Sequence, residues 1–453
     1  MHNNGILIAA PFSGNGKTTI SLGIMLALKS KGYNVQPFKV GPDYIDPGFH
    51  TYATGNSSYN LDTVMGNKKI MKEIYYKNSE GKDISVIEGV MGLYDGKSGN
   101  TSHGSSFEIS NELGIPVIMV LDISSMGRSA AAIVKGFQKM DRRLKLGGVI
   151  LNKAGTDSHC SLVKNAVEKI NHVPVLGCIK RNSNISLNSR YLGLIPQAEK
   201  KTRPEYFELL KNSVLENINL DKIVEISTHA KDNNHIIENI YNKRRKPVAR
   251  IAIAYSRAFN FYYRENFDLL EKFGAELCYF DPEKDSEIPE ADGIYIGGGY
   301  PEIYAEQLSE NKKLLDMIRN KIEDNMPVFA ECGGYMYLSQ AIVQNNIEYR
   351  MVGLIPAVSY MEKLVLGYRS AKAEKNNFLF NAGDSIRGHE FHHSNMKYFK
   401  EPEHIFRLNN GSMDGYSYKN MVAGYTHFYF PSNPRIPARF IAACLKYKKA
   451  RHK

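Results

Sequence analysis

Long apolar runs are missing from this sequence. The longest ones, Gly5–Pro11 and Ile115–Leu121, fall far short of the roughly 20 residues that a membrane-spanning helix needs. The first run leads into Ser-Gly-Asn-Gly-Lys, which is not the small-residue cleavage site of a secretory signal. We therefore expect a cytoplasmic protein that has no membrane partner.

Cysteine is scarce and scattered. No two of the five cysteines stand at the Cys-x-x-Cys spacing that is typical of zinc and redox sites. The sequence therefore predicts neither a disulfide framework nor a zinc site, although one thiol could still be chemically special. The five are Cys160, Cys178, Cys278, Cys332 and Cys444.

Low-complexity tracts and internal repeats are also absent, which argues against a disordered chain and against a repeat protein. The 453 residues are 43% hydrophobic and 23% charged, as in ordinary globular proteins. This length predicts roughly two to three domains. The formal net charge of +11 suits nucleic acid, an anionic membrane or a small polyanion as partner, but a solvated lysine-rich surface is the simpler interpretation.

Short β-branched runs alternate with helical stretches through the first two hundred residues. This alternation predicts a parallel sheet with helices on both faces. Helices are expected after Lys17, Arg128 and Ser161. The expected strands are Ile6–Ala10, Asn34–Val40, Ile84–Ile87, Val117–Leu121, Gly148–Leu151 and Pro174–Cys178.

A polar, charged stretch separates this part from a second one. New strands are expected at Val248–Tyr255, Ala275–Phe280, Gly293–Ile296 and Val328–Ala330, so the α/β alternation restarts. The predicted organisation is an N-terminal domain over residues 1–230, a linker over 231–247 and a second α/β domain over 248–453.

The first expected strand is followed by Pro11-Phe-Ser-Gly-Asn-Gly-Lys-Thr and then by a helix, which is the context of a P-loop. The glycines let backbone N–H groups surround phosphates, Lys17 reaches the outer phosphates, and Thr18 can bind Mg²⁺. A chance Gly-Lys-Thr at a strand–helix turn is the alternative, and Pro11 replaces the usual first glycine. We assign Gly14, Gly16, Lys17, Thr18 and Thr19 to the nucleotide.

Polar residues also follow other expected strands of this sheet. The carboxyl ends of parallel strands converge on the ligand crevice, so these residues are expected to meet the P-loop. Thr18, Asp43 and Glu88 are therefore candidate Mg²⁺ ligands, although an Asp beside Gly or Pro is often only a turn former. Asn152 is a candidate base contact and equally a common turn residue.

In the second part, Cys332 stands between an expected strand and a helix, flanked by small residues that permit a strained turn. The helix N-terminus would favour its thiolate, which makes Cys332 a candidate nucleophile, whereas a buried inert cysteine is the usual alternative. Backbone N–H groups at Gly298 and Gly299 could form an oxyanion hole. His427, near the C-terminus after a strand-like run, is the candidate base.

Together these segments resemble the cobyrinate a,c-diamide synthase family, in which a dethiobiotin-synthetase-like ATP domain is fused to a class I glutamine amidotransferase domain. The most specific segments are Ala10-Pro-Phe-Ser-Gly-Asn-Gly-Lys-Thr-Thr, Lys39-Val-Gly-Pro-Asp-Tyr-Ile-Asp, Ile87-Glu-Gly-Val-Met-Gly-Leu-Tyr-Asp-Gly, Ile296-Gly-Gly-Gly-Tyr-Pro-Glu, Glu331-Cys-Gly-Gly and Gly424-Tyr-Thr-His. Ordinary class I amidotransferases carry His-Pro-Glu at the base, whereas this chain has His427-Phe-Tyr. The resemblance therefore implies a Cys–His dyad.

The resemblance implies a carbon–nitrogen ligase of cobalamin biosynthesis. Such an enzyme uses glutamine, ATP and Mg²⁺ to amidate the a and c carboxylates of cobyrinate through phosphorylated intermediates. Neither nucleic acid nor a membrane is expected as a partner, and the number of subunits is left open. The residues expected near the substrate are Lys39, Asp43, Asp46 and Asp95.

Several alternatives remain open at this point. Nickel-sirohydrochlorin a,c-diamide synthase amidates the same two side chains on another macrocycle, and cobyric acid synthase amidates four others. A partition-type P-loop ATPase that binds DNA would explain the P-loop and the basic charge, but not Cys332 or His427. His389, His392 and His393 form a cluster that could be a metal site or an alternative base, and the resemblance implies that they lie near the substrate or the domain interface.

Overall fold

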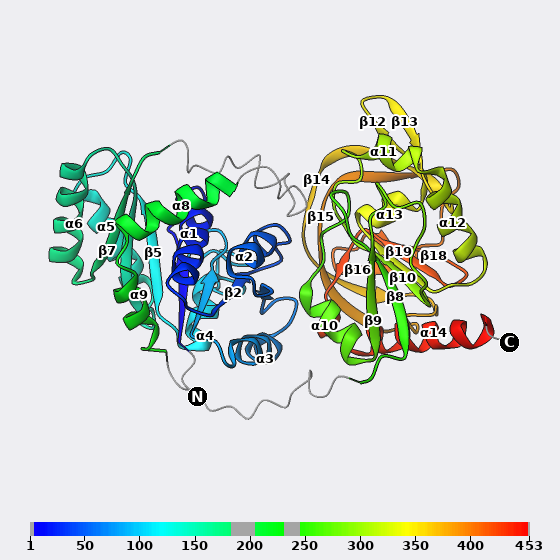
Figure 1. Ribbon diagram of the computed structural model, residues 1–453, viewed down its shortest axis with the longest axis horizontal. Helices are drawn as coiled ribbons and strands as arrows, with labels where there is room; N and C mark the ends of the chain where they lie inside the picture. Colours follow the sequence, from blue (N-terminus) through cyan, green and yellow to red (C-terminus); the bar gives the residue numbers. More distant parts are fainter. Residues whose placement is uncertain (1–3, 183–203, 231–244, 452–453) are drawn as a thin grey trace. The chain divides into compact units, whose positions relative to one another are not determined.

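The computed structural model describes residues 4–182, 204–230 and 245–451, and it divides into two compact units, Met1–Glu238 and Asn239–Lys453 (Figure 1). Each unit is an α/β domain built on a parallel sheet, so the predicted fold class is confirmed. Of the predicted linker, residues 231–244 lie outside the described residues.

The first unit holds a seven-stranded sheet in the order β3-β2-β4-β1-β5-β6-β7, and every neighbouring pair is parallel. Its strands are β1 (Gly5–Ala9), β2 (Val35–Val40), β3 (Tyr59–Leu61), β4 (Ile84–Glu88), β5 (Val117–Asp122), β6 (Leu146–Ala154) and β7 (Val175–Lys180). Its helices are α1 (Lys17–Ser30), α2 (Asp46–Thr54), α3 (Lys68–Ser79), α4 (Ser106–Leu113), α5 (Ser129–Met140), α6 (Asp157–Asn171), α8 (Pro204–Asn217) and α9 (Leu220–Ser227).

The central strands of this sheet are buried on both faces, which is why they appear in the sequence as short continuous apolar runs. Ile6 and Ile8 of β1 share a core with residues of α1, α8 and α9. The residue between them, Leu7, points to the opposite face and is also fully buried. The six strands expected in this domain are all present, and among its described strands only the short β3 was not predicted.

The second unit combines two sheets. The first has the order β18-β19-β11-β10-β8-β9 and is parallel except for the edge pair β18–β19. Its strands are β8 (Ala249–Ala254), β9 (Ala275–Phe280), β10 (Gly293–Ile296), β11 (Val328–Glu331), β18 (Tyr416–Tyr418) and β19 (Met421–Gly424). The helices are α10 (Arg264–Lys272), α11 (Ala305–Glu310), α12 (Lys312–Glu323), α13 (Gly333–Tyr337) and α14 (Arg435–Arg451), with a 3₁₀ turn η3 (Phe430–Ser432).

The second sheet of this unit was not predicted from the sequence. It is built around two long antiparallel strands that run side by side in Figure 1, β14 (Ile355–Ala373) and β15 (Ser385–Tyr398). The remaining strands are β12 (Ser339–Gln344), β13 (Ile347–Arg350), β16 (Phe406–Leu408), β17 (Met413–Asp414) and β20 (His427–Phe428). Because β20 pairs with β15, this sheet carries the candidate base His427.

One pair of cysteines corrects the sequence analysis. Cys160 in α6 and Cys178 in β7 form a disulfide, with Cα atoms 6.1 Å apart. The expectation that no disulfide forms is therefore wrong for this pair. The two residues are 18 positions apart in consecutive elements, and only the packing of α6 against β7 brings them together.

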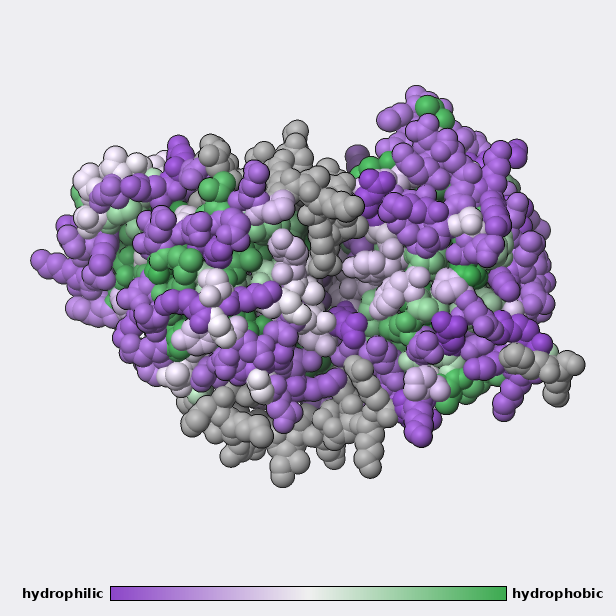
Figure 2. All heavy atoms as spheres, viewed as in Figure 1, coloured by the Kyte–Doolittle hydropathy of each residue, from purple (hydrophilic) through white to green (hydrophobic). Residues whose placement is uncertain are grey.

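Hydrophilic side chains cover much of the visible surface of both units (Figure 2). Such a surface fits the chain's net charge of +11 and its 23% of charged residues. Within the described ranges, no helix is both long and apolar enough to span a bilayer.

Candidate active sites

The loop between β1 and α1 has the backbone geometry of a phosphate-binding loop. Gly14 and Gly16 have φ angles of 86° and 91°, a backbone conformation that residues other than glycine rarely adopt. Gly16 is also the N-cap of α1, so the first N–H groups of this 14-residue helix face the loop. The second residue of the helix, Thr18, donates a hydrogen bond from Oγ1 to Glu88 Oε1 over 2.6 Å.

Lys17 begins α1 and reaches across the loop. Its Nζ donates to the carbonyl oxygen of Met91 over 2.6 Å. Burial and the neighbouring charge of Lys39 lower the pKa of Lys17 to about 8. The partner residue Met91 has a φ of 45°, so the backbone is strained where it meets the lysine.

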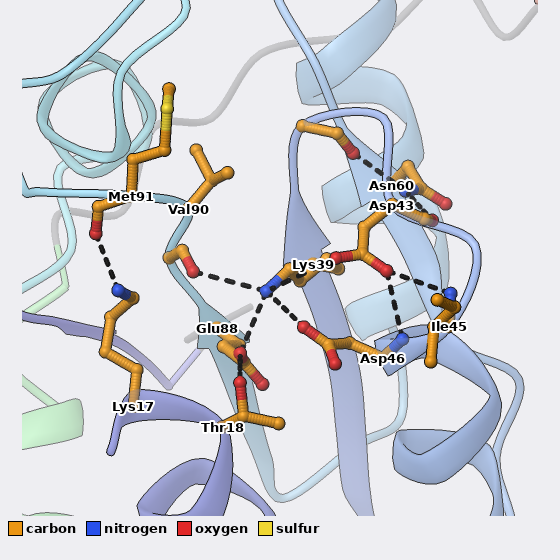
Figure 3. A network of polar contacts seen from close by, with 12 residues as sticks. Lys17, Thr18, Lys39, Asp43, Ile45, Asp46, Asn60, Glu88, Val90 and Met91 are labelled. Atoms are coloured by element: carbon orange, nitrogen blue, oxygen red, sulfur yellow. Dashed lines mark hydrogen bonds and ion pairs between the residues drawn. The ribbon is translucent and has the colours of Figure 1, made fainter. Parts of the chain in front are cut away.

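Lys39 is buried and lies among three carboxylates, of which two are buried and that of Asp43 is partly exposed (Figure 3). Its Nζ is 2.5 Å from Asp46 Oδ2, 2.8 Å from Glu88 Oε1 and 3.8 Å from Asp43 Oδ2. The second oxygen of Glu88 lies 2.7 Å from Nε2 of the fully buried His50. Strand β2, helix α2 and the end of β4 thus meet at one carboxylate, Glu88.

Burial and the neighbouring charges shift the pKa values of Lys39, Asp46 and Glu88. Burial raises the pKa of Asp46 well above its ordinary value, and the charges of Asp43 and Glu88 add to this effect. Burial also acts to raise the pKa of Glu88, but Lys39 and His50 hold it well below the usual range. Against the effect of burial, Asp46 and Glu88 raise the pKa of Lys39. Glu88 is therefore a buried, ionised carboxylate beside the phosphate loop.

These oxygen donors suit a magnesium ion, which prefers carboxylate and hydroxyl oxygens together with substrate phosphates. Thr18 and Glu88 supply such oxygens in direct contact with one another. Asp43 is turned partly away, since its Oδ1 accepts the backbone N–H groups of Ile45 and Asp46. Across the described ranges, no group of three His, Cys, Asp or Glu side chains is placed to hold a metal by itself.

Three other predicted nucleotide or substrate residues lie in the same unit. Asn152, at the end of β6, is mostly buried and donates from Nδ2 to the carbonyl oxygen of Asn15 in the loop, over 2.8 Å. It therefore braces the phosphate loop, and its contact with a base stays a prediction. Asp95 accepts the N–H of Gly92 in a turn. Thr19 follows Thr18 in the first turn of α1.

In the second unit, Cys332 occupies a sharp turn between β11 and α13. Its φ of 52° and ψ of −106° are strained for a residue with a side chain. The backbone holds this turn, because Cys332 N–H donates to Gly424 and Gly334 N–H donates to Gly297. Such strand–turn–helix geometry presents a nucleophile at the tip of the turn.

His427 and Gly298 lie directly against Cys332. A Cβ added at Gly298 would stand 3.2 Å from Cys332 Cβ and would clash with the imidazole of His427. Only glycine fits between the two side chains. In the same way, a Cβ on Gly333 would stand 3.1 Å from the backbone nitrogen of Gly299. The segment predicted to form the oxyanion hole therefore lies beside the turn at Cys332.

The segment before His427, the candidate base, is held by the buried carboxylate of Asp414. Asp414 accepts hydrogen bonds from the backbone N–H groups of Tyr425 and Thr426 and from the Thr426 hydroxyl. His427 follows directly and is fully buried. Burial acts to lower the pKa of His427, but Cys332 and Glu331 raise it to about 10.

The histidine cluster of β15 lies beside this centre. His389 is the register partner of His427, and Phe391 places its carbonyl oxygen 3.8 Å from Cys332 Sγ. His392 stacks on Tyr425 with ring centroids 4.0 Å apart. Burial and the charge of His427 lower the pKa of His389 to about 3, and burial lowers that of His392 to about 4. Burial therefore favours the neutral form of both rings.

Several residues of the two sites were not singled out from the sequence. These residues are buried and make side-chain hydrogen bonds at a site, and they are Asn15, His50, Glu331 and Asp414. The position of Glu331 next to the predicted nucleophile is the only feature of the sequence that favoured a role for Glu331 in the site. The other three depend on partners far along the chain or on turn geometry that residue types alone do not reveal.

Comparisons with known proteins match both units of the chain. A family model described as CobQ/CobB/MinD/ParA nucleotide binding domain matches residues 6–194, and one described as CobB/CobQ-like glutamine amidotransferase domain matches residues 250–435. A protein of Picrophilus torridus named cobyrinate a,c-diamide synthase is 49% identical over 444 residues, covering 98% of this chain and 99% of that protein.

Two further relatives carry the same name. The protein from Priestia megaterium is 43% identical over 458 residues, with 100% of this chain and 99% of that protein covered. The protein from Thermoplasma volcanium is 43% identical over 453 residues, with 98% of each chain covered. The similarity therefore extends through both units.

Proposed function

Because the chain belongs to the cobyrinate a,c-diamide synthase family, we propose that it converts the a and c side-chain carboxylates of cobyrinate into amides. Membership makes the chain a carbon–nitrogen ligase of cobalamin biosynthesis that takes its nitrogen from glutamine and uses ATP. We propose, beyond family membership, the identity of the macrocycle, the reaction intermediates and the roles of the residues given below.

The observation that supports the proposal is that one chain combines a phosphate-binding loop beside a buried carboxylate with a cysteine turn beside a buried histidine. One unit joins a phosphate loop to an ionised buried carboxylate through Thr18 and Glu88. The other places Cys332 at a strained turn against His427. An enzyme that activates a carboxylate with ATP and releases ammonia from glutamine needs both centres.

In the first centre, a carboxylate of the substrate attacks the γ-phosphorus of ATP, and the bond to the β-phosphate oxygen breaks. The loop N–H groups and Lys17 neutralise charge on the phosphates. Mg²⁺ held by Thr18 and Glu88 would supply further charge neutralisation, and Asp43 is the remaining candidate ligand. Ammonia then attacks the acyl carbon, phosphate leaves and an amide remains. Lys39, Asp46 and Asp95 are proposed to shape the substrate side.

In the second centre, Cys332 Sγ attacks the glutamine carboxamide, and N–H groups at Gly298 and Gly299 stabilise the oxyanion. The carbon–nitrogen bond breaks as the His427 imidazolium gives its proton to the departing ammonia. Water then cleaves the thioester and releases glutamate. The raised pKa of His427, about 10, supports its role as the proton donor at neutral pH.

The rival functions make different demands. A partition-type ATPase shares the nucleotide-binding family model but has no use for the amidotransferase match over residues 250–435. Nickel-sirohydrochlorin is a closer rival substrate, because its amidation needs the same two centres. The name shared by relatives at 43–49% identity favours cobyrinate.

A turnover assay tests the proposal. Purified protein is given ATP, Mg²⁺ and glutamine with cobyrinate or with nickel-sirohydrochlorin in parallel, and the products are weighed by mass spectrometry. We expect two carboxylate-to-amide mass shifts on cobyrinate. Conversion of the nickel macrocycle alone, or more than two amidations, would contradict the proposed substrate.

A further inference from the structure

Glu331, the residue before Cys332, points its carboxylate toward the ring of His427. Glu331 ends β11, and its side chain is 1% exposed. Its Oε1 lies 3.8 Å from Nδ1 of His427, whose side chain is fully buried. No carboxylate follows His427 in the sequence, where Phe428 and Tyr429 stand instead.

Two hydrogen bonds fix the position of this carboxylate. The hydroxyl of Tyr295 donates to Oε1 over 2.8 Å, and the backbone N–H of Phe428 donates to Oε2 over 3.1 Å. Tyr295 and Phe428 are both buried. Because Phe428 follows His427, Glu331 holds the strand that carries the base, while its own backbone continues directly into Cys332.

A buried imidazolium needs nearby negative charge, since burial alone disfavours the charged form. Glu331 is the carboxylate that acts with Cys332 to raise the pKa of His427 to about 10. Among the other groups near the ring, His389 contributes no negative charge, and Glu390 is paired with Arg369 of β14. Asp414 binds the preceding backbone through Tyr425 and Thr426.

We propose that Glu331 is a positioning residue of the glutaminase centre, which turns Nδ1 of His427 toward itself and leaves Nε2 for Cys332. This inference rests on the proposed roles of Cys332 and His427. It replaces the two-residue centre implied by the sequence with three residues, of which Glu331 and Cys332 are adjacent in the chain.

The test compares Glu331→Gln with Glu331→Asp in the full-length protein. The glutamine side chain can still accept from Phe428 N–H, so the variant removes charge with little change in size. We expect glutaminase kcat to fall about tenfold or more at neutral pH. The alkaline limb of the pH–rate profile should move to lower pH by about one unit or more, because the imidazolium loses its partner charge. Glu331→Asp keeps the negative charge, so the alkaline limb of its pH–rate profile should stay at the wild-type pH.

Asp414→Asn is the matched control, because Asp414 is also a buried carboxylate that accepts N–H groups next to His427. It should lower the melting temperature without moving the alkaline limb. If Glu331→Gln leaves the limb at the wild-type position, Glu331 is only structural and the inference is wrong. Glutaminase activity that survives Cys332→Ser would instead refute the proposed function itself.

Discussion

At the scale of single residues, Glu88 connects the parts of the candidate synthetase site. One oxygen accepts from Thr18 and Lys39, and the other contacts His50. These three partners come from α1, β2 and α2. A change at Glu88 therefore alters the hydroxyl at the phosphate loop and the charge around Lys39 together.

Replacing Glu88 with Gln should reduce amide synthesis by about a hundredfold or more, since it removes charge next to the transferring phosphoryl group. Glutaminase activity should remain, because Cys332 and His427 belong to the other unit. Both rates are measured on the same preparation, with ammonia-driven synthesis as a third assay.

Glu108→Gln serves as the control for Glu88→Gln. Glu108 is a buried glutamate of the same unit that accepts from Thr63 and from the N–H of Gly104. It should leave synthesis near the wild-type rate. If Glu88→Gln abolishes both activities together with the thermal unfolding transition, the carboxylate holds the fold and not the reaction.

At the scale of elements, the parallel sheets were predictable and the antiparallel layer was not. Strands such as β1 and β10 are fully buried, so their sequences are short apolar runs. By contrast, β14 exposes Leu364 and Leu366 to solvent and has an irregular register, which obscures the alternation of apolar and polar residues. The elbow at Cys332 was predictable because small residues follow the nucleophile.

The carboxylate contacts could not be predicted because they join distant segments. Glu331 accepts from Phe428, 97 residues later in the chain, and Thr18 donates to Glu88, 70 residues later. Residue types at strand ends indicated that Glu88 would meet the phosphate loop. No pattern indicated that Glu331 would face the base.

The disulfide between α6 and β7 leads to a prediction for stability. Because it closes a loop across 18 residues, its loss should destabilise the first unit by about 3 kcal/mol in the chain-entropy description. Cys160→Ser should lower the first unit's melting temperature. Cys278→Ser, in the second unit, is the control and should not.

Thiol titration tests the same bond directly. Denatured, unreduced protein should show the three free cysteines Cys278, Cys332 and Cys444, and all five after reduction. Five reactive thiols before reduction would contradict the disulfide.

At the scale of the whole molecule, the chain carries two chemistries with separate needs. In the proposed function, the first centre consumes ATP and requires ammonia, while the second produces ammonia and requires no nucleotide. Each centre is built within its own unit, from residues such as Lys17 and Glu88 in one, and Cys332 and His427 in the other. The two activities should therefore be separable by single substitutions.

Cys332→Ser should abolish glutamine-dependent synthesis but preserve synthesis from a high concentration of free ammonia. The hydroxyl that replaces the thiol is a much weaker nucleophile, so no thioester forms, whereas the first centre keeps its phosphate loop and carboxylates. The measurement is amide formation with each nitrogen source, and Cys444→Ser, which removes another buried thiol of the same unit, is the control. Unchanged glutamine-dependent turnover in Cys332→Ser would mean that this thiol is structural. Loss of ammonia-driven synthesis as well would mean that the two units cannot work independently.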